Sequence, residues 1–169
     1  MARQHPALTT ELAAWTMEDM PLLQRLNEPA MTAHLGGPET AAQLERRLER
    51  YAAAGTDATR MFKVVVDGEP VGSVGFWDRE WNGEAVYESG WSVLPEFQGR
   101  GIASRAMEMV IGLARATGRH DSMHAFPSVD NAPSNAICAR LGFDLLGECR
   151  FEYPKGHWMT CNDWRLTLR

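Results

Sequence analysis

A glycine-rich run from Gln98 to Ser104 (QGRGIAS) is the part of the chain best suited to bind a ligand. It follows the stretch Trp91–Leu94 and leads into an amphipathic segment that begins at Ile102. A turn of this kind, between a strand and the start of a helix, leaves several backbone N–H groups unpaired and adds the positive end of the helix dipole. Together these groups form an anion site suited to a phosphate or a diphosphate.

Two common phosphate-binding loops do not fit this run. The sequence has no G-x-x-x-x-G-K-[ST] motif, so a P-loop is excluded. A dinucleotide fingerprint requires G-x-G-x-x-G, and Ser104 stands where the third glycine should be. Asp121 lies at nearly the right distance for a ribose contact, but it precedes the next apolar run instead of ending it. The Rossmann interpretation is therefore disfavoured, and a plain strand-to-helix turn is the other alternative.

A second polar constellation lies in the segment 131–143. Asn131 suits a helix N-cap, so the segment predicts a short helix. Asn131, Ser134 and Cys138 follow one another at spacings of three and four residues and therefore share a face, while Ile137 points toward a core. This small polar face near the glycine-rich run could line a ligand channel. The alternative is a capped surface helix in which Ser134 bonds only to local backbone.

The elements that must hold these residues follow from the hydrophobic pattern and the turn signals. We expect helices over about 16–27, 40–54 (ended by Gly55), 102–117 and 131–142, and strands over 62–66, 71–77, 84–94, 122–125, 143–151 and 158–168. Turns at Asp67-Gly68 and Asn82-Gly83 make the first three strands an antiparallel meander. The order of elements predicts one domain over residues 1–169, of class α/β, with a mixed, mostly antiparallel central sheet flanked by helices.

Composition limits the classes of function. The chain has 169 residues and a formal net charge of −5, so it is long enough for one core, disfavours a nucleic acid backbone and would attract a cationic amine. Its three cysteines form no C-x-x-C or Cys/His spacing, so neither a metal site nor a disulfide framework is expected. No stretch has membrane-spanning length, and no signal-peptide pattern is present. We therefore expect a cytoplasmic protein with no metal and no membrane or nucleic acid partner.

These motifs carry a resemblance to a known family. Gln98–Ala103 resembles the Q/R-x-x-G-x-G/A acetyl-CoA loop of the GNAT N-acetyltransferase superfamily, and 131–143 resembles its later N-x-x-A/S…G-F helix in register. Within that superfamily the chain is most similar to the branch that contains ribosomal-protein N-terminal (alanine/serine) acetyltransferases. Segments 8–12, 34–38 and 88–91 resemble its opening strand, the loop before its second helix and its central strand. The likeness spans essentially the whole chain.

The resemblance implies the GNAT fold and acetyl-CoA as co-substrate. It implies that the backbone around Trp91–Leu94 holds the pantetheine arm, that N–H groups from Gly99 to Ser104 bind the diphosphate, and that Asn131 holds the pantetheine amides. The implied cofactor-binding residues are Trp91, Val93, Leu94, Gln98, Gly99, Arg100, Gly101, Ile102, Ala103, Ser104 and Asn131. There are two departures. An arginine usual in the opening segment is missing, and Cys138 stands where many members carry the tyrosine that protonates the departing thiolate.

Acetyl transfer from a thioester to an amine needs a base for the amine and an acid for the thiolate. Glu88 is the candidate base, acting through a water, because it shares a strand side with Val86 and Gly90 and because a carboxylate in a dry cleft can have a raised pKa. A solvent-facing glutamate is the alternative. The resemblance makes Ser134 the candidate acid, with Cys138 as the alternative. A covalent route through Cys138 is disfavoured because no histidine partner is evident.

The predicted function is acetyl-CoA-dependent N-acetylation of a primary amine by direct attack in a ternary complex. The acceptor is either a protein N-terminus or a small amine such as an aminoglycoside, a polyamine or an amino acid. A non-catalytic CoA-binding sensor or partner module is the competing function, and a homodimer is compatible with either. The segments expected to ring the acceptor pocket contain His34, Trp77, Trp81, Phe126, His157 and Trp158.

Overall fold

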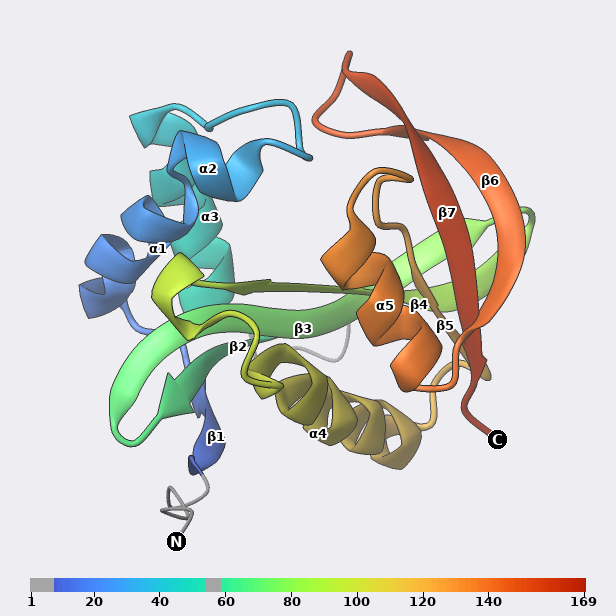
Figure 1. The fold of residues 1–169 in the computed structure, drawn as a ribbon, viewed down its shortest axis with the longest axis horizontal. Helices are drawn as coiled ribbons and strands as arrows, with labels where there is room; N and C mark the ends of the chain where they lie inside the picture. The colour runs from blue at the N-terminus through green and yellow to red at the C-terminus, as the bar shows by residue number, and fades with distance from the viewer. Residues whose placement is uncertain (1–7, 54–58) are drawn as a thin grey trace, which may run out of the picture.

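The computed structural model describes residues 8–53 and 59–169, and Gly55, the predicted end of the second helix, lies outside them. A seven-stranded sheet runs through the molecule in the order β1-β2-β3-β4-β5-β7-β6 (Figure 1). The strands are β1 (Thr10–Ala14), β2 (Thr59–Val66), β3 (Glu69–Trp81), β4 (Glu84–Val93), β5 (Ser122–Ala125), β6 (Asp144–Glu152) and β7 (Trp158–Thr167). Among the described strands β4 and β5 pair in parallel and the others pair antiparallel. The predicted mixed, mostly antiparallel sheet is confirmed, and this pairing excludes the parallel sheet of a Rossmann fold.

The turn between β3 and β4 sets the register on which the site depends. Asn82 and Gly83 have φ angles of +50° and +79°. A tight two-residue hairpin turn requires this left-handed conformation, and Asn and Gly adopt it most easily. The strands then pair in a register that places Trp77 opposite Glu88. The predicted antiparallel meander is confirmed, although β3 is longer at both ends than the predicted 71–77.

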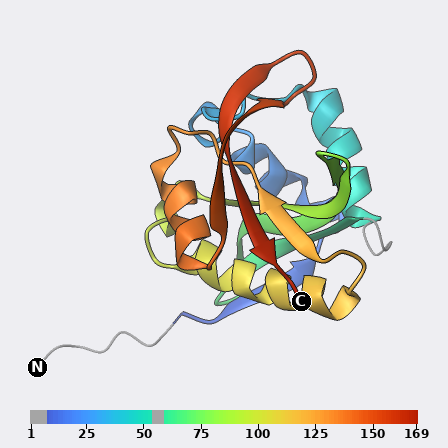
Figure 2. The ribbon, with the colours of Figure 1, turned by 90° about the vertical axis from the view of Figure 1, so that its right-hand side faces the viewer.

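Helices cover both faces of the sheet (Figures 1 and 2). They are the 3₁₀ helices η1 (Met17–Asp19) and η2 (Pro95–Phe97) and the α-helices α1 (Met20–Leu26), α2 (Pro29–Thr32), α3 (Ala41–Ala52), α4 (Ile102–Thr117) and α5 (Ala132–Arg140). Figure 1 shows α1, α2 and α3 on one side of the sheet and α4 on the other, with α5 beside α4. Figure 2 shows the β6–β7 hairpin, which extends the sheet beyond β5. None of the helices in the described ranges is long and apolar enough to cross a membrane.

Each face of the sheet has its own apolar core. On the α4 face, Met107 of α4 belongs to one buried cluster with Tyr87 of β4 and Cys138 of α5. On the opposite face, Leu48 of α3 and Met61 of β2 belong to a second cluster, which also holds the buried side chains of α1. Because close-packed interiors resist deformation, the sheet is held firmly between its two helix layers.

Two glycines with open space around them should respond oppositely to alanine. Gly83 has a positive φ at the β3–β4 turn, whereas Gly112 lies inside α4, and an added Cβ would meet nothing within 4 Å at either position. Gly83→Ala should lower the free energy of unfolding by about 1–2 kcal/mol, because a Cβ strains the left-handed conformation. Gly112→Ala should raise it by roughly 0.5–1 kcal/mol, because alanine favours the helix. Urea denaturation measures both, and a Gly83→Ala variant as stable as the parent would contradict this description of the turn.

Candidate active site

A cavity of about 610 Å³ opens where β4 and β5 separate. The two strands pair at two positions, the second of which joins Glu88 to His124, and no further pair follows in the described residues. The cavity is walled by residues 88–92 of β4, by the end of β5 and the residues after it (125–128), and by side chains of α1, α3 and α5. It therefore lies at the carboxyl end of the parallel strand pair, where open sheets offer a binding crevice.

The part of β4 beyond Glu88 has one free edge. Its other edge pairs with β3, where the Leu94 N–H donates to the Val71 carbonyl at 2.8 Å. Backbone groups alternate between the two edges of an antiparallel strand, so those of Trp91 and Val93 point to the free edge. A ligand with amide groups can bond to this edge as an added strand would. The Leu94 N–H is already paired and is not available in this way.

Glu88 lies in the wall of the cavity and is 9 % exposed. Its Oε2 accepts from the Trp77 indole N–H at 3.1 Å and from an Arg79 guanidinium N–H at 2.9 Å, while no side chain in the described ranges donates to Oε1. Burial raises the pKa of Glu88 above the ordinary glutamate value and outweighs Arg79 and Trp77, which act to lower it. A buried carboxyl group with this pKa and one oxygen without a side-chain donor is suited to accept a proton.

We did not predict Arg79 as a site residue. Its guanidinium lies over three aromatic rings, with its central carbon 4.5 Å from the ring centre of Phe151, 5.4 Å from Trp81 and 5.6 Å from Phe126. These contacts hold the cation beside Glu88 without neutralising it. A signal for this contact does exist in the sequence, because the Asn-Gly turn sets a register in which Arg79 and Glu88 are diagonal neighbours on adjacent strands.

Helix α5 brings two of its three predicted polar residues to the cavity. Asn131 caps the helix, its side-chain oxygen accepts from the Ser134 N–H at 3.3 Å, and both residues line the cavity. The cap uses the Ser134 N–H and not its hydroxyl. Cys138 is instead fully buried in the α4 core, where burial raises the pKa of its thiol to about 12. The prediction that Cys138 shares the ligand-facing side is wrong, because α5 passes from the cavity into the core within about one turn.

The glycine-rich run forms the junction between β4 and α4. Gly99 and Gly101 have φ angles of +73° and +74°, and Gly101 is the N-cap residue of α4, with no side-chain cap. The first N–H groups of α4 can therefore bind an anion. Gln98 donates a side-chain N–H to the Val93 carbonyl at 2.8 Å, which ties this junction to the end of β4.

The remaining predicted loop residues divide between the surface and the core. Arg100 is exposed, whereas the side chains of Ile102 and Ala103 pack in or against the α4 core. The buried Ser104 hydroxyl accepts from the Arg140 guanidinium at 3.2 Å. We did not predict Arg140, which brings a second cation to the first turn of α4. Because it lies 36 residues from Ser104, no local spacing marks it.

The side chains expected to ring an acceptor pocket fall into two groups. His34, Trp77 and Phe126 line the cavity, and Trp81, His157 and Trp158 do not. Trp81 lies behind the cavity wall, where its indole N–H donates at 3.0 Å to the buried Asp163. Asp163 also lies 2.6 Å from the Nδ1 atom of His124, the residue paired with Glu88 on β5. The buried Asp163 carboxylate therefore links Trp81 to His124 behind the cavity wall.

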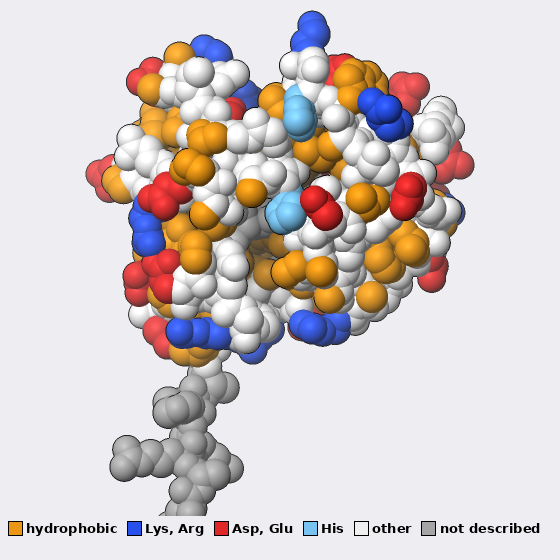
Figure 3. Space-filling model, turned by 45° about the horizontal axis from the view of Figure 1, so that its top comes forward, with side chains coloured by type: hydrophobic (Ala, Val, Ile, Leu, Met, Phe, Trp, Pro, Cys, Tyr) orange, Lys and Arg blue, Asp and Glu red, His pale blue; other side chains and the backbone are white. Residues whose placement is uncertain are grey.

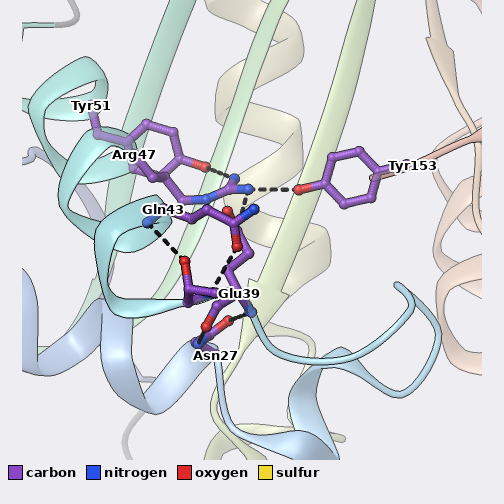
Figure 4. A network of polar contacts seen from close by, with 7 residues as sticks. Asn27, Glu39, Gln43, Arg47, Tyr51 and Tyr153 are labelled. Atoms are coloured by element: carbon purple, nitrogen blue, oxygen red, sulfur yellow. Dashed lines mark hydrogen bonds and ion pairs between the residues drawn. The ribbon is translucent and has the colours of Figure 1, made fainter. Parts of the chain in front are cut away.

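The wall of the cavity that α1, α3 and the β6–β7 loop form contains a polar network that we did not predict (Figure 4). Arg47 of α3 donates to the Tyr51 hydroxyl at 2.9 Å and to the Tyr153 hydroxyl at 2.6 Å, and it forms an ion pair with Glu39. Asn27 bonds in turn to the backbone of Glu39. Tyr153 lies between β6 and β7, 106 residues from Arg47, so no local pattern could have joined them.

Among the described residues, the thiols lie away from the cavity. Cys149 and Cys161 are free thiols opposite each other on β6 and β7, and burial raises the pKa of each to about 11. Neither lines the cavity. Across the two described ranges, no group of three or more His, Cys, Asp or Glu side chains could hold a metal ion.

Solved structures share this fold. A putative acetyltransferase of Salmonella typhimurium, yncA, solved with its cofactor acetyl-CoA, is 24% identical, covers 96% of this chain and 95% of its own, and has a TM-score of 0.77. An acetyltransferase of the same organism that modifies the N-terminal serine of ribosomal protein L7/L12 is 20% identical, with coverages of 94% and 95% and a TM-score of 0.74. The ribosomal-protein-S5-alanine acetyltransferase of Vibrio fischeri is 18% identical, with coverages of 99% and 96% and a TM-score of 0.74. At these identities the likeness is one of fold.

The family is shown by the sequence. A comparison with curated proteins finds no significant match. The sequence model of the acetyltransferase (GNAT) domain matches residues 10–144. This range runs from β1 through α5 and contains the free edge of β4, the glycine-rich junction and the Asn131 cap. The chain therefore belongs to the GNAT acetyltransferase family.

Proposed function

We propose that the chain is an acetyl-CoA-dependent N-acetyltransferase that moves an acetyl group to a primary amine by direct attack in a ternary complex. The position of Glu88 is the observation that supports this proposal most strongly. It is a buried carboxyl group with a raised pKa, in the wall of a cavity and beside the free edge of β4. An acceptor amine and a ligand bound along that edge would meet at this point.

The shape and chemistry of the site support a fit to acetyl-CoA. The free edge offers the N–H groups of Trp91 and Val93 to the amides of a pantetheine arm, and Asn131 lines the same cavity. The first turn of α4, which begins after Gly101, offers N–H groups to a diphosphate, with Arg140 beside it. When bound, acetyl-CoA supplies an acetyl group activated as a thioester. The similar fold of yncA was solved with acetyl-CoA.

Glu88 is the proposed general base. A primary amine is largely protonated near neutral pH and must lose a proton before it can attack. The Glu88 carboxylate accepts that proton through a water, and its raised pKa makes it a stronger acceptor than an exposed glutamate. Arg79 and Trp77 hold Oε2, so the carboxyl group keeps one orientation while Oε1 serves as the acceptor.

The backbone of β4 and the Ser134 hydroxyl supply the remaining groups. Whichever of the Trp91 and Val93 N–H groups does not bind a pantetheine amide can stabilise the negative charge that develops on the carbonyl oxygen, and losing one such donor typically costs about 3 kcal/mol. Ser134 lines the cavity and its hydroxyl is not used by the helix cap, so this hydroxyl can donate a hydrogen bond to the departing thiolate. No enzyme nucleophile is required.

The proposed acceptor is a primary amine, at a protein N-terminus or in a small molecule. Two proteins of similar fold support the first: one modifies the N-terminal serine of ribosomal protein L7/L12, and one is the ribosomal-protein-S5-alanine acetyltransferase. The net charge of −5 suits a cationic amine in either case.

Thermal denaturation with and without acetyl-CoA, followed by free-thiol release across a panel of primary amines, tests the proposal. A ligand that binds the folded state raises Tm. We expect stabilisation by acetyl-CoA and thiol release with at least one amine. Stabilisation without release on any amine would favour a non-catalytic CoA-binding module, and no stabilisation would contradict both functions.

Glu88→Gln should lower kcat by about 100- to 10,000-fold, the range that general base catalysis contributes. Its affinity for acetyl-CoA should stay unchanged. The parent's activity should rise with pH as Glu88 loses its proton. Because burial raises this pKa, the rise should lie above the range of an ordinary glutamate. The variant should lack that rise in a pH–rate profile.

Glu84→Gln is the matched control, since it makes the same change at an exposed position of the same strand. It should leave both kcat and the pH profile as in the parent. Parent-like turnover by Glu88→Gln at every pH would remove Glu88 from the mechanism.

Ser134→Ala removes the hydroxyl but keeps the N–H that bonds to Asn131. Loss of one hydrogen bond to a charged group costs about 1.5–3 kcal/mol, so kcat should fall about tenfold to a hundredfold. The Kd for acetyl-CoA and the Tm should not change. Ser134→Thr keeps a hydroxyl and should recover most of the loss. Equal thiol release by the parent and Ser134→Ala would show that another group protonates the thiolate.

A further inference from the structure

Two contacts bridge the rim of the cavity where the segment between α2 and α3 meets the opposite half of the molecule (Figures 1 and 3). His34 Nδ1 lies 3.1 Å from an Asp130 carboxylate oxygen in the loop before α5. Gly36 lies against His157 in the β6–β7 loop, since an added Cβ would be 2.9 Å from that ring. Figure 3 looks toward this rim and shows the two halves touching, with a hollow below. The helical half and the strand half are thus joined above the cavity.

A third contact lies below the rim and is more deeply buried (Figure 4). The Arg47 side chain is 19% exposed, and Figure 4 shows its guanidinium group between the hydroxyl groups of Tyr51 and Tyr153. Its bond to Tyr153 crosses from α3 to the β6–β7 loop, whereas its bond to Tyr51 stays within α3. A hydrogen bond from a charged donor is stronger than a neutral one, and arginine does not lose its charge. Arg47 therefore joins two walls of the cavity.

These contacts limit how an acceptor can reach Glu88. Under the proposed function, the free edge of β4 and the first turn of α4 are taken by acetyl-CoA. The opposite end of the cavity is formed by α1, α3 and the β6–β7 loop, and the bond from Arg47 to Tyr153 connects α3 to that loop. A polypeptide with its terminal amine at Glu88 would continue away from acetyl-CoA, toward this wall.

We propose that the acceptor is a small free amine that fits wholly inside the cavity. The contact between Arg47 and Tyr153 then excludes acceptors that continue into a polypeptide chain. This inference rests on the proposed function and narrows its acceptor class. Arg47 and Tyr153 act as specificity-determining residues and take no part in proton transfer.

The size and lining of the cavity agree with such an acceptor. Its volume of about 610 Å³ lies within the range of roughly 300–1,000 Å³ that holds small ligands, and the acetyl end of the co-substrate takes part of it. Leu23, Leu44 and Met61 line the cavity near the α1–α3 wall. The charge of Arg47 in that wall is balanced by its ion pair with Glu39. A primary amine with an apolar body, its ammonium group at Glu88, fits this distribution.

A length series of acceptors tests the inference. The four probes are phenethylamine, leucine amide, a leucyl dipeptide amide and a pentapeptide amide that begins with leucine. Thiol release in the presence of acetyl-CoA gives kcat/KM for each. The parent enzyme should favour leucine amide over the pentapeptide by at least about tenfold, which corresponds to roughly 1.4 kcal/mol in the transition state.

A double variant and a matched control test whether these contacts cause the preference for the short acceptor. Tyr153→Phe with His157→Ala removes two of the three contacts, and the preference for leucine amide over the pentapeptide should fall by about tenfold, which corresponds to roughly 1.4 kcal/mol. Tyr51→Phe removes the same kind of bond to Arg47 but within α3, so it should keep the parent's preference. Thermal denaturation verifies that each variant is folded.

The outcomes separate this inference from the proposed function. Equal kcat/KM of the parent for leucine amide and for the pentapeptide would overturn the inference and leave N-acetylation intact. An equal loss of preference in Tyr51→Phe and in the double variant would also overturn it. Absence of thiol release with all four amines, in a protein that binds acetyl-CoA, would count against the proposed function, and the inference would fall with it.

Discussion

The separation of β4 from β5 after Glu88 is the constraint on which the rest of the structure depends. Buried backbone N–H and C=O groups are costly to leave unpaired, so a central strand normally has both edges filled. Here β4 keeps one edge open beyond its last pair with β5, and the cavity occupies the wedge between them. The apolar clusters on the two faces of the sheet hold that wedge open. An extended ligand with amide groups would complete the hydrogen bonding that the sheet leaves unmade.

Two opposing effects set the chemistry of Glu88. Removal from water favours the neutral acid, while Arg79 and Trp77 favour the carboxylate, and burial is the stronger effect. Aromatic rings hold Arg79 beside Glu88, so the carboxyl group is oriented while its affinity for a proton remains high. The ion pair of Arg25 with Glu96 shows the contrast: both side chains are about half exposed, and water screens their attraction.

Local signals explain most of the fold and part of the site. The Asn82-Gly83 turn, the glycine-rich junction and the Asn131 cap each depend on a few consecutive residues, and each forms the structure that its pattern predicts. Helical spacing places Cys138 wrongly, because it assigns residues to a face but does not tell where that face leaves a cavity and enters a core.

Other parts of the site depend on how the layers pack. The contact of Arg47 with Tyr153 and that of Ser104 with Arg140 join segments 106 and 36 residues apart. Periodicity carries no information about such pairs, since either partner alone is an ordinary helix or loop residue. The walls of the cavity far from the glycine-rich junction could therefore be located only from the folded chain.

Hydrogen exchange of backbone amides, with and without saturating acetyl-CoA, tests most directly whether the free edge of β4 and the first turn of α4 hold this ligand. We expect slower exchange at Trp91, at Val93 and across residues 99–104 when acetyl-CoA is present, with little change in β1 and β2. Unchanged exchange in both segments at saturation, or protection confined to other strands, would contradict this assignment.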